Sequence, residues 1–452
     1  MANRRPSSLS SHTATRRHVL IGGLAAGLGL AASGPAHASS VDPTRAGGES
    51  GPVGFRTNGD PDFHPVTFEL PAPTGRKALG TAAIHLVDRS RQDPTMPSGS
   101  RELMISVWYP ASRSDESPVA KYMPAKTAVA VDDAWTGEYG LALPSGSFDF
   151  ANTETHSRTG VPAQGPRHPV VLFSPGYQYS RFVNTAQVED LASREYVVVT
   201  MDHTHETPVE FPRGRFLPGV PPTQLPDPDF TRRLVETRTA DARFVLNQLE
   251  LIADGQNPDA EGNDLPEGLA DAMDLRRIGM FGFSLGGYAT ANTMLEDRRV
   301  LAGLDLDGTL QDDRAKGPLA EVAEKGLDRP FLLFGSDETQ RTDPAKDGYD
   351  ESWASFWAAQ RGGKLNLGLK HTKQKAFTDY QFVFDQLFRG IYGDDPIISS
   401  VMKALVGSAN PHRSVLAQRE YLGAFFDQTL RRRPELLLRG DSPKYPEVHF
   451  SR

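Results

Sequence analysis

The order of apolar segments predicts an α/β fold in which helices flank a mostly parallel central sheet. Strand-like and helix-like segments alternate along the chain, without an internal repeat or a heptad run. The continuous apolar runs 169–173 and 196–201 are typical of strands that are buried on both faces. We therefore expect residues 65–452 to form one domain, with insertions at about 111–167 and 203–229.

The first 38 residues have the features of a twin-arginine export signal. Arg16 and Arg17 precede a mildly apolar stretch, 19–32, that ends near Ala38. Because this stretch is shorter than the ~20 apolar residues of a membrane span, we expect a secreted protein without stable membrane insertion. Residues 39–64 are rich in Ser, Gly, Pro and Thr, and they are predicted to form a flexible leader.

The composition excludes several kinds of site and partner. The chain has no cysteine, which removes disulfides, thiolate metal ligands and a Cys nucleophile. Its net charge is −8, and loss of the signal with its four arginines would lower the charge to −12. Nucleic acids and anionic membranes attract basic surfaces, so this acidic chain is not expected to bind either.

Local patterns predict the elements that precede the serine motif described below. The expected strands are 66–70, 77–88, 102–109, 169–173 and 196–201, and the expected helices are 181–194 and 229–253. Prolines between 208 and 228 argue against regular structure there. The insertion 111–167 is expected to be either a lid over a pocket or a surface segment with its own aromatic cluster.

The sequence RIGMFGFSLGGY, residues 277–288, predicts a serine nucleophile. Ser284 would lie on a sharp turn between a buried strand at 278–281 and a helix that begins near Leu285. Gly282 and Gly286 leave room for that turn, and the helix N-terminus supplies N–H groups for a developing oxyanion. The five-residue pattern is common in Gly-rich loops, so the flanking strand and helix carry the prediction.

Two acids are placed to support the nucleophile. Asp307 and Asp337 each follow an apolar strand after Ser284, in the order that an α/β-hydrolase requires. Asp337 lies in a polar loop, where acids are ordinarily solvated. Asp305 would share a face with Asp307 if the strand continued, so a bend at 306–308 is needed to separate them.

His371 is the expected base. It follows the segment 365–370, and a loop that leaves the last strand can bring an imidazole to Ser284. His412 and His449 are expected to be solvated surface histidines instead.

A cluster of polar residues at 202–206 raises the possibility of a metal site. His203 and His205 are two residues apart in a loop and lack the H-E-x-x-H spacing, so a hydrogen-bonded rim of the cleft is favoured. The turn from Ser174 to Tyr177 follows a predicted strand, at the place where α/β-hydrolases present a second oxyanion N–H. No metal and no cofactor are expected.

Taken together, these segments resemble the plasma-type platelet-activating factor acetylhydrolase family of lipase-like α/β-hydrolases. The resemblance rests on PVVLFSPGYQYSRF, DLASREYVVVTMDHTHE, GFSLGG, LAGLDLDG, PFLLFGS and a late His followed by FTDYQ, and it covers roughly residues 102–430. The resemblance implies that Ser284 is the nucleophile, Asp307 the acid and His371 the base. It also implies that the backbone N–H groups of Tyr177 and Leu285 form the oxyanion hole.

The chain departs from the family pattern at two places. Phe283 stands where a His commonly precedes the nucleophile, which is harmless if that side chain only packs. More residues separate His371 from Phe377 and Asp379 than the family's H-x-x-F-x-D spacing has. The family pattern therefore fixes the position of Ser284 better than that of the histidine.

These predictions describe an exported serine esterase that hydrolyses short or oxidised acyl esters through a Ser-His-Asp acyl-enzyme mechanism. The sn-2 acyl group of a phospholipid is one candidate substrate. An alternative is a general carboxylesterase, lipase or polyester hydrolase without a phospholipid preference. A different class is a non-catalytic binding module of the same fold, although such modules commonly lack a triad residue. The expected partner is a small-molecule ester, and no oligomeric state is predicted.

Overall fold

The computed structural model describes residues 65–96, 99–138, 146–165, 167–219, 229–312, 317–337, 349–393 and 396–451. The predicted export signal and leader, and the segment 220–228 of the proline-rich insertion, lie outside these ranges. Within them, an 11-stranded sheet has the order β13-β12-β11-β10-β9-β5-β6-β2-β1-β4-β3. Its strands are β1 (Ala78–Gln92), β2 (Ser100–Ala111), β3 (Val119–Lys121), β4 (Glu154–Arg158), β5 (His168–Ser174), β6 (Val197–Met201), β9 (Met273–Phe283), β10 (Val300–Leu306), β11 (Phe331–Ser336), β12 (Lys364–Leu369) and β13 (Val448–Phe450).

The centre of the sheet is parallel, as predicted. Strands β12, β11, β10, β9, β5 and β6 pair in parallel, whereas β2 and β13 join this block antiparallel at its two sides. Every residue of β5 and β6 is buried, because parallel strands of this kind are covered on both faces. A separate short hairpin is formed by β7 (Val209–Glu210) and β8 (Phe216–Leu217).

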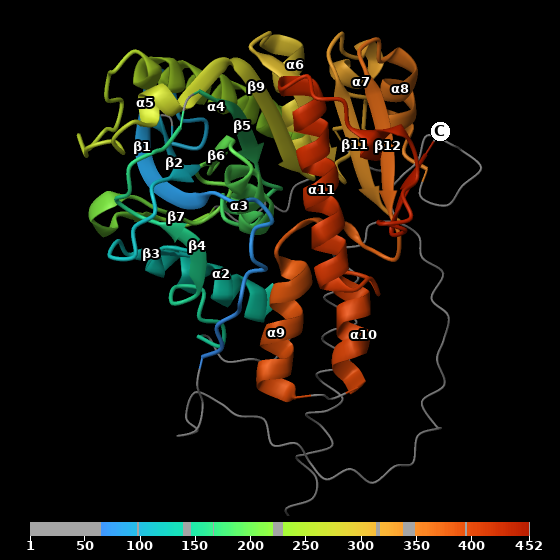
Figure 1. Ribbon diagram of the computed structural model, residues 1–452, viewed down its shortest axis with the longest axis horizontal. Coiled ribbons are helices and arrows are strands. Elements are labelled where there is room, and N and C mark those ends of the chain that lie inside the picture. The colour runs from blue at the N-terminus through green and yellow to red at the C-terminus, as the bar shows by residue number, and fades with distance from the viewer. Residues whose placement is uncertain are drawn as a thin grey trace, which may run out of the picture.

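Helices cover both faces of the sheet (Figure 1). One buried core includes α3 (Thr185–Ser193), α9 (Tyr380–Tyr392), α10 (Pro396–Leu405) and α11 (Pro411–Leu430). The other core includes α4 (Phe230–Ala253), α5 (Leu269–Ala272), α6 (Leu285–Glu296), α7 (Glu321–Lys325) and α8 (Glu351–Ala359). The remaining helices are α2 (Ala125–Glu138) and the 3-10 turns η1 (Pro212–Gly214), η2 (Gln374–Phe377) and η3 (Leu436–Arg439). Helices α9 and α10 contact each other and extend away from the sheet.

The strand predicted at 66–70 is wrong. Only an isolated bridge between Val66 and Phe148 forms there, and Phe68 and Leu70 are buried without strand pairing. The segment is apolar because Phe68 packs edge-on against Tyr122, with ring centroids 4.9 Å apart, and not because it belongs to a sheet.

The insertion 111–167 extends the edge of the sheet. Within it, β4 pairs in parallel with β1, and β3 pairs antiparallel with β4. Phe148 and Phe150 pack together at 6.0 Å, and Phe150 also contacts Phe68 at 5.9 Å. Both rings belong to the same buried core as helices α3, α9, α10 and α11, so they do not form a cluster separate from the main fold. Two further aromatic residues of this insertion are Trp135 and Tyr139, and the side chain of Trp135 and the whole of Tyr139 lie outside the described part of the chain.

The parallel strands bring the predicted site residues to one edge of the sheet. Tyr177, Ser284, Asp307, Asp337 and His371 follow the carboxyl ends of β5, β9, β10, β11 and β12. Ligand sites in open α/β sheets lie at this edge. The candidate site is therefore built on five neighbouring strand ends, although these residues are far apart in sequence.

Candidate active site

Ser284 adopts the strained turn that the sequence predicts between strand β9 and helix α6. Its backbone angles are φ 52° and ψ −120°, and its N–H donates to Leu306 O at 2.9 Å. A Cβ atom at Gly282 would lie 2.0 Å from Gly286 O, and one at Gly286 would lie 1.9 Å from Ser174 O. This close backbone packing holds a conformation that a non-glycine residue rarely adopts.

The turn after β5 lies directly against the turn that carries Ser284. A Cβ atom at Gly176 would come within 2.9 Å of the Phe283 ring, which is itself buried. In the described part of the chain, neither the N–H of Tyr177 nor that of Leu285 has a hydrogen-bond acceptor. The two packed turns thus each carry an N–H group without an acceptor, one of them at the start of a helix, and an oxyanion hole needs donors of this kind.

Asp307 is fully buried and firmly bound. Its two carboxylate oxygens accept hydrogen bonds from Ser336 N at 2.7 Å and from Ser336 Oγ at 3.0 Å. Its left-handed φ of 58° supplies the predicted bend, which separates it from Asp305. Burial raises the pKa of Asp305 well above its usual value, and the neighbouring Asp307 adds to this shift. Asp305 also accepts a hydrogen bond from Gly308 N at 2.8 Å.

The structure does not bring His371 to Ser284. The His371 side chain is 74% exposed, and its Nδ1 atom lies 4.0 Å from Asp337 Oδ2. The His371 N–H also donates to Asp337, while its carbonyl accepts from Ser408 N at 2.8 Å and from Ala409 N at 2.9 Å. In this conformation the side chain of His371 therefore contacts Asp337, and it forms no hydrogen bond with Asp307 in the described part of the chain.

Gln374 is the residue whose side chain reaches Ser284. Its Nε2 atom lies 3.4 Å from Ser284 Oγ and donates to Asp307 O at 2.9 Å. An amide has no basic nitrogen, so Gln374 can orient the serine hydroxyl but cannot accept its proton.

Sequence reasoning missed this residue, although a signal was present. In the H-x-x-F-x-D spacing, Phe377 and Asp379 fit the last two fixed positions, and counting back places Gln374 where the histidine stands. Asp379 is fully buried and accepts hydrogen bonds from Ala186 N at 3.1 Å and from Tyr122 Oη at 3.1 Å. It anchors the segment that follows Gln374 to the body of the fold.

The polar cluster at 202–206 is bonded to protein groups. Asp202 accepts from Arg181, Glu206 from Arg238, and His203 is held between Ser174 and Asp241. His205 Nε2 lies 3.5 Å from Asp93 Oδ1. No group of three or more His, Cys, Asp or Glu side chains in the described ranges is arranged to hold a metal ion.

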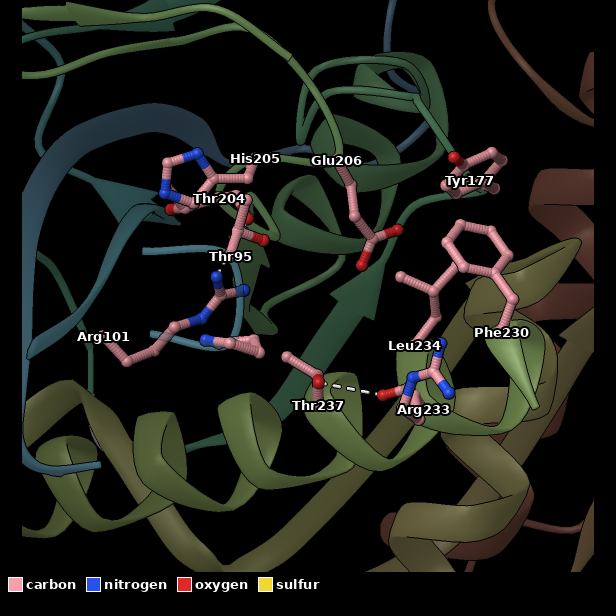
Figure 2. Close-up of a pocket in the computed structure, with 11 residues that line it drawn as sticks. Thr95, Arg101, Tyr177, Thr204, His205, Glu206, Phe230, Arg233, Leu234 and Thr237 are labelled. Atoms are coloured by element: carbon pink, nitrogen blue, oxygen red, sulfur yellow. Dashed lines mark hydrogen bonds between the residues drawn. The ribbon is translucent and has the colours of Figure 1, made fainter. Parts of the chain in front are cut away.

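A cavity of about 270 Å³ is lined in part by Tyr177, from the turn after β5, and by Phe230, from helix α4 (Figure 2). Figure 2 shows Glu206 pointing toward helix α4, and the Tyr177 ring lies edge-on to Phe230 with centroids 5.8 Å apart. Arg101 and Thr237 line the same cavity, whereas Ser284 does not. The cavity therefore shares Tyr177 with the predicted oxyanion turn but does not include the predicted nucleophile.

The chain is similar to known esterases over most of its length. It is 30% identical over 402 residues to the "Probable 1-alkyl-2-acetylglycerophosphocholine esterase" of Arthroderma benhamiae, covering 85% of this chain and 94% of that protein. It is 23% identical over 253 residues to the platelet-activating factor acetylhydrolase of Canis lupus familiaris, covering 52% of this chain and 55% of that protein.

Solved structures give the same result for the fold. A ferulic acid esterase from Streptomyces cinnamoneus has a TM-score of 0.67 and 34% sequence identity, and the match covers 85% of this chain and 99% of that chain. No protein-family model matches the chain. Among the described helices, none is both long and apolar enough to cross a bilayer.

These similarities confirm the α/β-hydrolase fold that the strand order indicates, and they agree with the resemblance seen in the sequence motifs. The fungal relative and the solved ferulic acid esterase each match 85% of this chain, and both are named as esterases. The chain therefore belongs to the platelet-activating factor acetylhydrolase family of α/β-hydrolases and is a carboxylic-ester hydrolase.

Proposed function

We propose that this chain is an exported serine esterase in which Ser284 is the nucleophile. The observation that carries the proposal is the strained turn of Ser284, which packs against the turn after β5, and the N–H groups of Tyr177 and Leu285 in these two turns have no acceptor in the described part of the chain. A nucleophile and two oxyanion donors are the minimum arrangement for acyl transfer. The twin-arginine features of residues 1–38 support export.

In the proposed reaction, Ser284 Oγ attacks the ester carbonyl and its proton passes to a base. The carbonyl oxygen becomes an oxyanion that accepts hydrogen bonds from Tyr177 N and Leu285 N. Collapse of this intermediate releases the alcohol, which takes the proton from the base, and leaves an acyl-enzyme. Water then attacks the acyl group by the same route and restores Ser284. The buried carboxylate of Asp307 is the proposed acid that stabilises the charged base.

His371 is proposed as the base, as the sequence predicts. It is the histidine that follows strand β12, and it lies three residues before Gln374, whose side chain reaches Ser284. For proton transfer, the segment 371–374 must change so that the imidazole replaces the Gln374 amide near Ser284 Oγ. This requirement makes His371 and Gln374 a matched pair for mutagenesis.

The proposed substrates are short or oxidised acyl esters, including the sn-2 acyl group of a phospholipid. The names of the fungal and canine relatives support this substrate class. A second candidate is an aromatic acyl ester, which the similarity to a ferulic acid esterase suggests. The Tyr179 ring is half-buried and lies edge-on to Phe283, 5.5 Å away, so an aromatic surface adjoins the nucleophile.

A substrate panel tests the proposal. Purified mature protein would be given p-nitrophenyl esters of graded chain length, a phospholipid with a short sn-2 acyl group, and methyl ferulate, with Ser284→Ala as the control. We expect turnover of short acyl esters by the wild type and its loss in Ser284→Ala, by a factor of about 10⁴ to 10⁶. Equal turnover by the two proteins would overturn the serine mechanism. A preference for methyl ferulate would select the second substrate class.

A further inference from the structure

A buried arginine holds the back of the predicted oxyanion turn. Arg238, on helix α4, is 1% exposed, and its guanidinium donates to the backbone carbonyls of both Pro175 and Gly176. The Nη2 atom lies 3.1 Å from Gly176 O. One planar group therefore binds two consecutive peptide carbonyls, which is a use of the guanidinium fork that a lysine cannot copy.

Binding of the Gly176 carbonyl fixes the direction of the Tyr177 N–H. These two groups belong to the same peptide unit, which is planar and, like the other described peptide bonds, not cis. In a trans peptide the C=O and the N–H point in opposite directions. The Gly176 carbonyl accepts from Arg238 and, at 3.1 Å, from the N–H of Tyr179, and as long as it faces these donors the Tyr177 N–H must point in the opposite direction.

The turn needs such an anchor because its central residue is glycine. Gly176 has no side chain to restrict rotation of the peptides on either side of it, and a Cβ atom there would press on the Phe283 ring. The close approach to Phe283 thus requires a glycine at position 176, and glycine restricts its backbone angles less than any other residue does. A rotated peptide would point a carbonyl oxygen at the developing oxyanion and would destabilise it.

Arg238 is in turn held by Glu206. Its Nε atom lies 3.1 Å from both carboxylate oxygens of Glu206, and its Nη2 atom lies 2.6 Å from one of them. Both side chains are buried, so the charges compensate each other and the guanidinium has a fixed orientation. Arg238 therefore affects the site mainly by orienting the peptides of Pro175 and Gly176, and less by adding a net charge.

A second set of buried bonds supports the start of the same turn. Ser174 Oγ lies 2.9 Å from His203 Nε2, and His203 Nδ1 lies 3.0 Å from Asp241 Oδ2. Burial, and then the charge of Arg238, lower the pKa of His203, so we assign a neutral ring that donates to Asp241 and accepts from Ser174. This Ser-His-Asp series has the order of a catalytic relay, but Ser174 is fully buried and no substrate reaches it. It is a scaffold, and Arg101 extends it by binding Asp241 at 2.7 Å.

We propose that Arg238 is a positioning residue for the oxyanion hole, which holds the peptides of Pro175 and Gly176 so that the Tyr177 N–H faces Ser284. This inference rests on the proposed function, because it takes the Tyr177 N–H as an oxyanion donor. It assigns the buried part of the polar cluster at 202–206 to the architecture of the active site.

The test compares variants that remove the guanidinium group of Arg238 without leaving the buried carboxylate of Glu206 unpaired. The double variant Glu206→Gln/Arg238→Met removes both charges, and Arg238→Lys keeps a cation opposite Glu206. The matched control is Arg243→Met on the same helix, because the Arg243 side chain is 48% exposed and pairs with Glu296 at the surface. Each protein is titrated with a fluorophosphonate, so that kcat and KM for p-nitrophenyl acetate are expressed per active site.

We expect kcat per active site to fall about 100-fold or more in the double variant, the usual loss for one oxyanion donor. KM should change by less than about threefold, because the donor acts on the transition state and not on the bound ester. Affinity for a trifluoromethyl ketone, whose adduct with serine carries an oxyanion, should fall by the same factor as kcat/KM. Arg238→Lys should show a smaller loss of the same kind, and Arg243→Met should match the wild type.

An unchanged kcat per active site would overturn the inference. This holds even if the melting temperature and the titrated fraction of active protein both fell, because an arginine that only stabilises the fold would give that result. If the double variant does not fold, Arg238→Lys decides by the same readout. Failure of the proposed function looks different, because wild type and Ser284→Ala would then hydrolyse the ester equally and the fluorophosphonate would not label Ser284.

Discussion

Asp307 and Asp337 follow neighbouring parallel strands but are bound in different ways. Asp307 is fully buried with both oxygens bonded to Ser336, whereas the Asp337 side chain is 39% exposed and bonds to the His371 backbone. We expect Asp307→Asn to lower kcat by about 10⁴-fold, because an amide holds the base in the wrong tautomer. Asp337→Asn should lower kcat by less than about tenfold. Steady-state kinetics on the two proteins check this ranking, and the opposite ranking would move the acid to Asp337.

His371 and Gln374 separate two accounts of the base. If His371 accepts the proton, His371→Ala should lower kcat by about 10⁴-fold, whereas Gln374→Ala should have a smaller effect because the amide only orients Ser284. The matched variant is Gln374→His, which places an imidazole where the amide now contacts Ser284 Oγ at 3.4 Å. A near-normal rate in His371→Ala would contradict His371 as the base, and a gain in Gln374→His would show that an imidazole at residue 374 can act on Ser284 where the wild type has an amide.

At the scale of single residues, the sequence predicts what local geometry determines. Ser284 and its flanking glycines can be recognised because the turn requires all three residues within one five-residue stretch of sequence. The base is harder to predict, because its register depends on contacts that are distant in sequence. The His371 N–H is bound by Asp337, and the Asp379 N–H donates to Val183 O at 2.8 Å. These two anchors determine which side chain of the segment faces the serine.

At the scale of elements, the contact between the turn at Ser284 and the turn after β5 depends on Gly286. A Cβ atom there would lie 1.9 Å from Ser174 O, a backbone atom that cannot rotate away. We expect Gly286→Ala to lower the free energy of unfolding by about 3 kcal/mol or more. Gly363→Ala is the control, since its nearest neighbour would be 3.8 Å away, and it should change stability by less than about 0.5 kcal/mol. Urea unfolding measures both, and equal stabilities would refute the packing argument.

Strands in the centre of the sheet are easier to predict than strands at its edge. The apolar runs of β5 and β6 have unbroken burial, so their positions agree with the predictions to within a residue or two. Strand β4 has the polar sequence ETHSR, and only its alternate residues are buried. Its pairing with β1 follows from the tertiary structure, which local propensity does not contain.

At the scale of the whole molecule, the proposed export depends on the arginine pair near the N-terminus. Changing Arg16 and Arg17 to lysine keeps the charge of the segment, but it should block a route that recognises two consecutive arginines. We expect the double variant to lose esterase activity in the culture medium and to retain it inside the cell. Undiminished secretion would contradict the twin-arginine route, and the activity of the purified protein would serve as the control for folding.

The fold as a whole could be predicted because the alternation of strands and helices admits few arrangements. The network behind the oxyanion turn could not be predicted, since its members come from β5, from the loop after β6 and from helix α4. Arg238 and Glu206 lie 32 residues apart in sequence and meet only when helix α4 packs on the sheet. A sequence shows charged residues at these positions, but their pairing follows from the complete fold.

The central claim is that Ser284 is an activated nucleophile, and stoichiometric labelling tests it most directly. A fluorophosphonate reacts with a serine hydroxyl only where a base and an oxyanion site assist it. The wild type should take up one label per chain, which peptide mapping should place on Ser284 with parallel loss of ester turnover. A label on another residue, or full turnover by a protein whose Ser284 is labelled, would contradict the account.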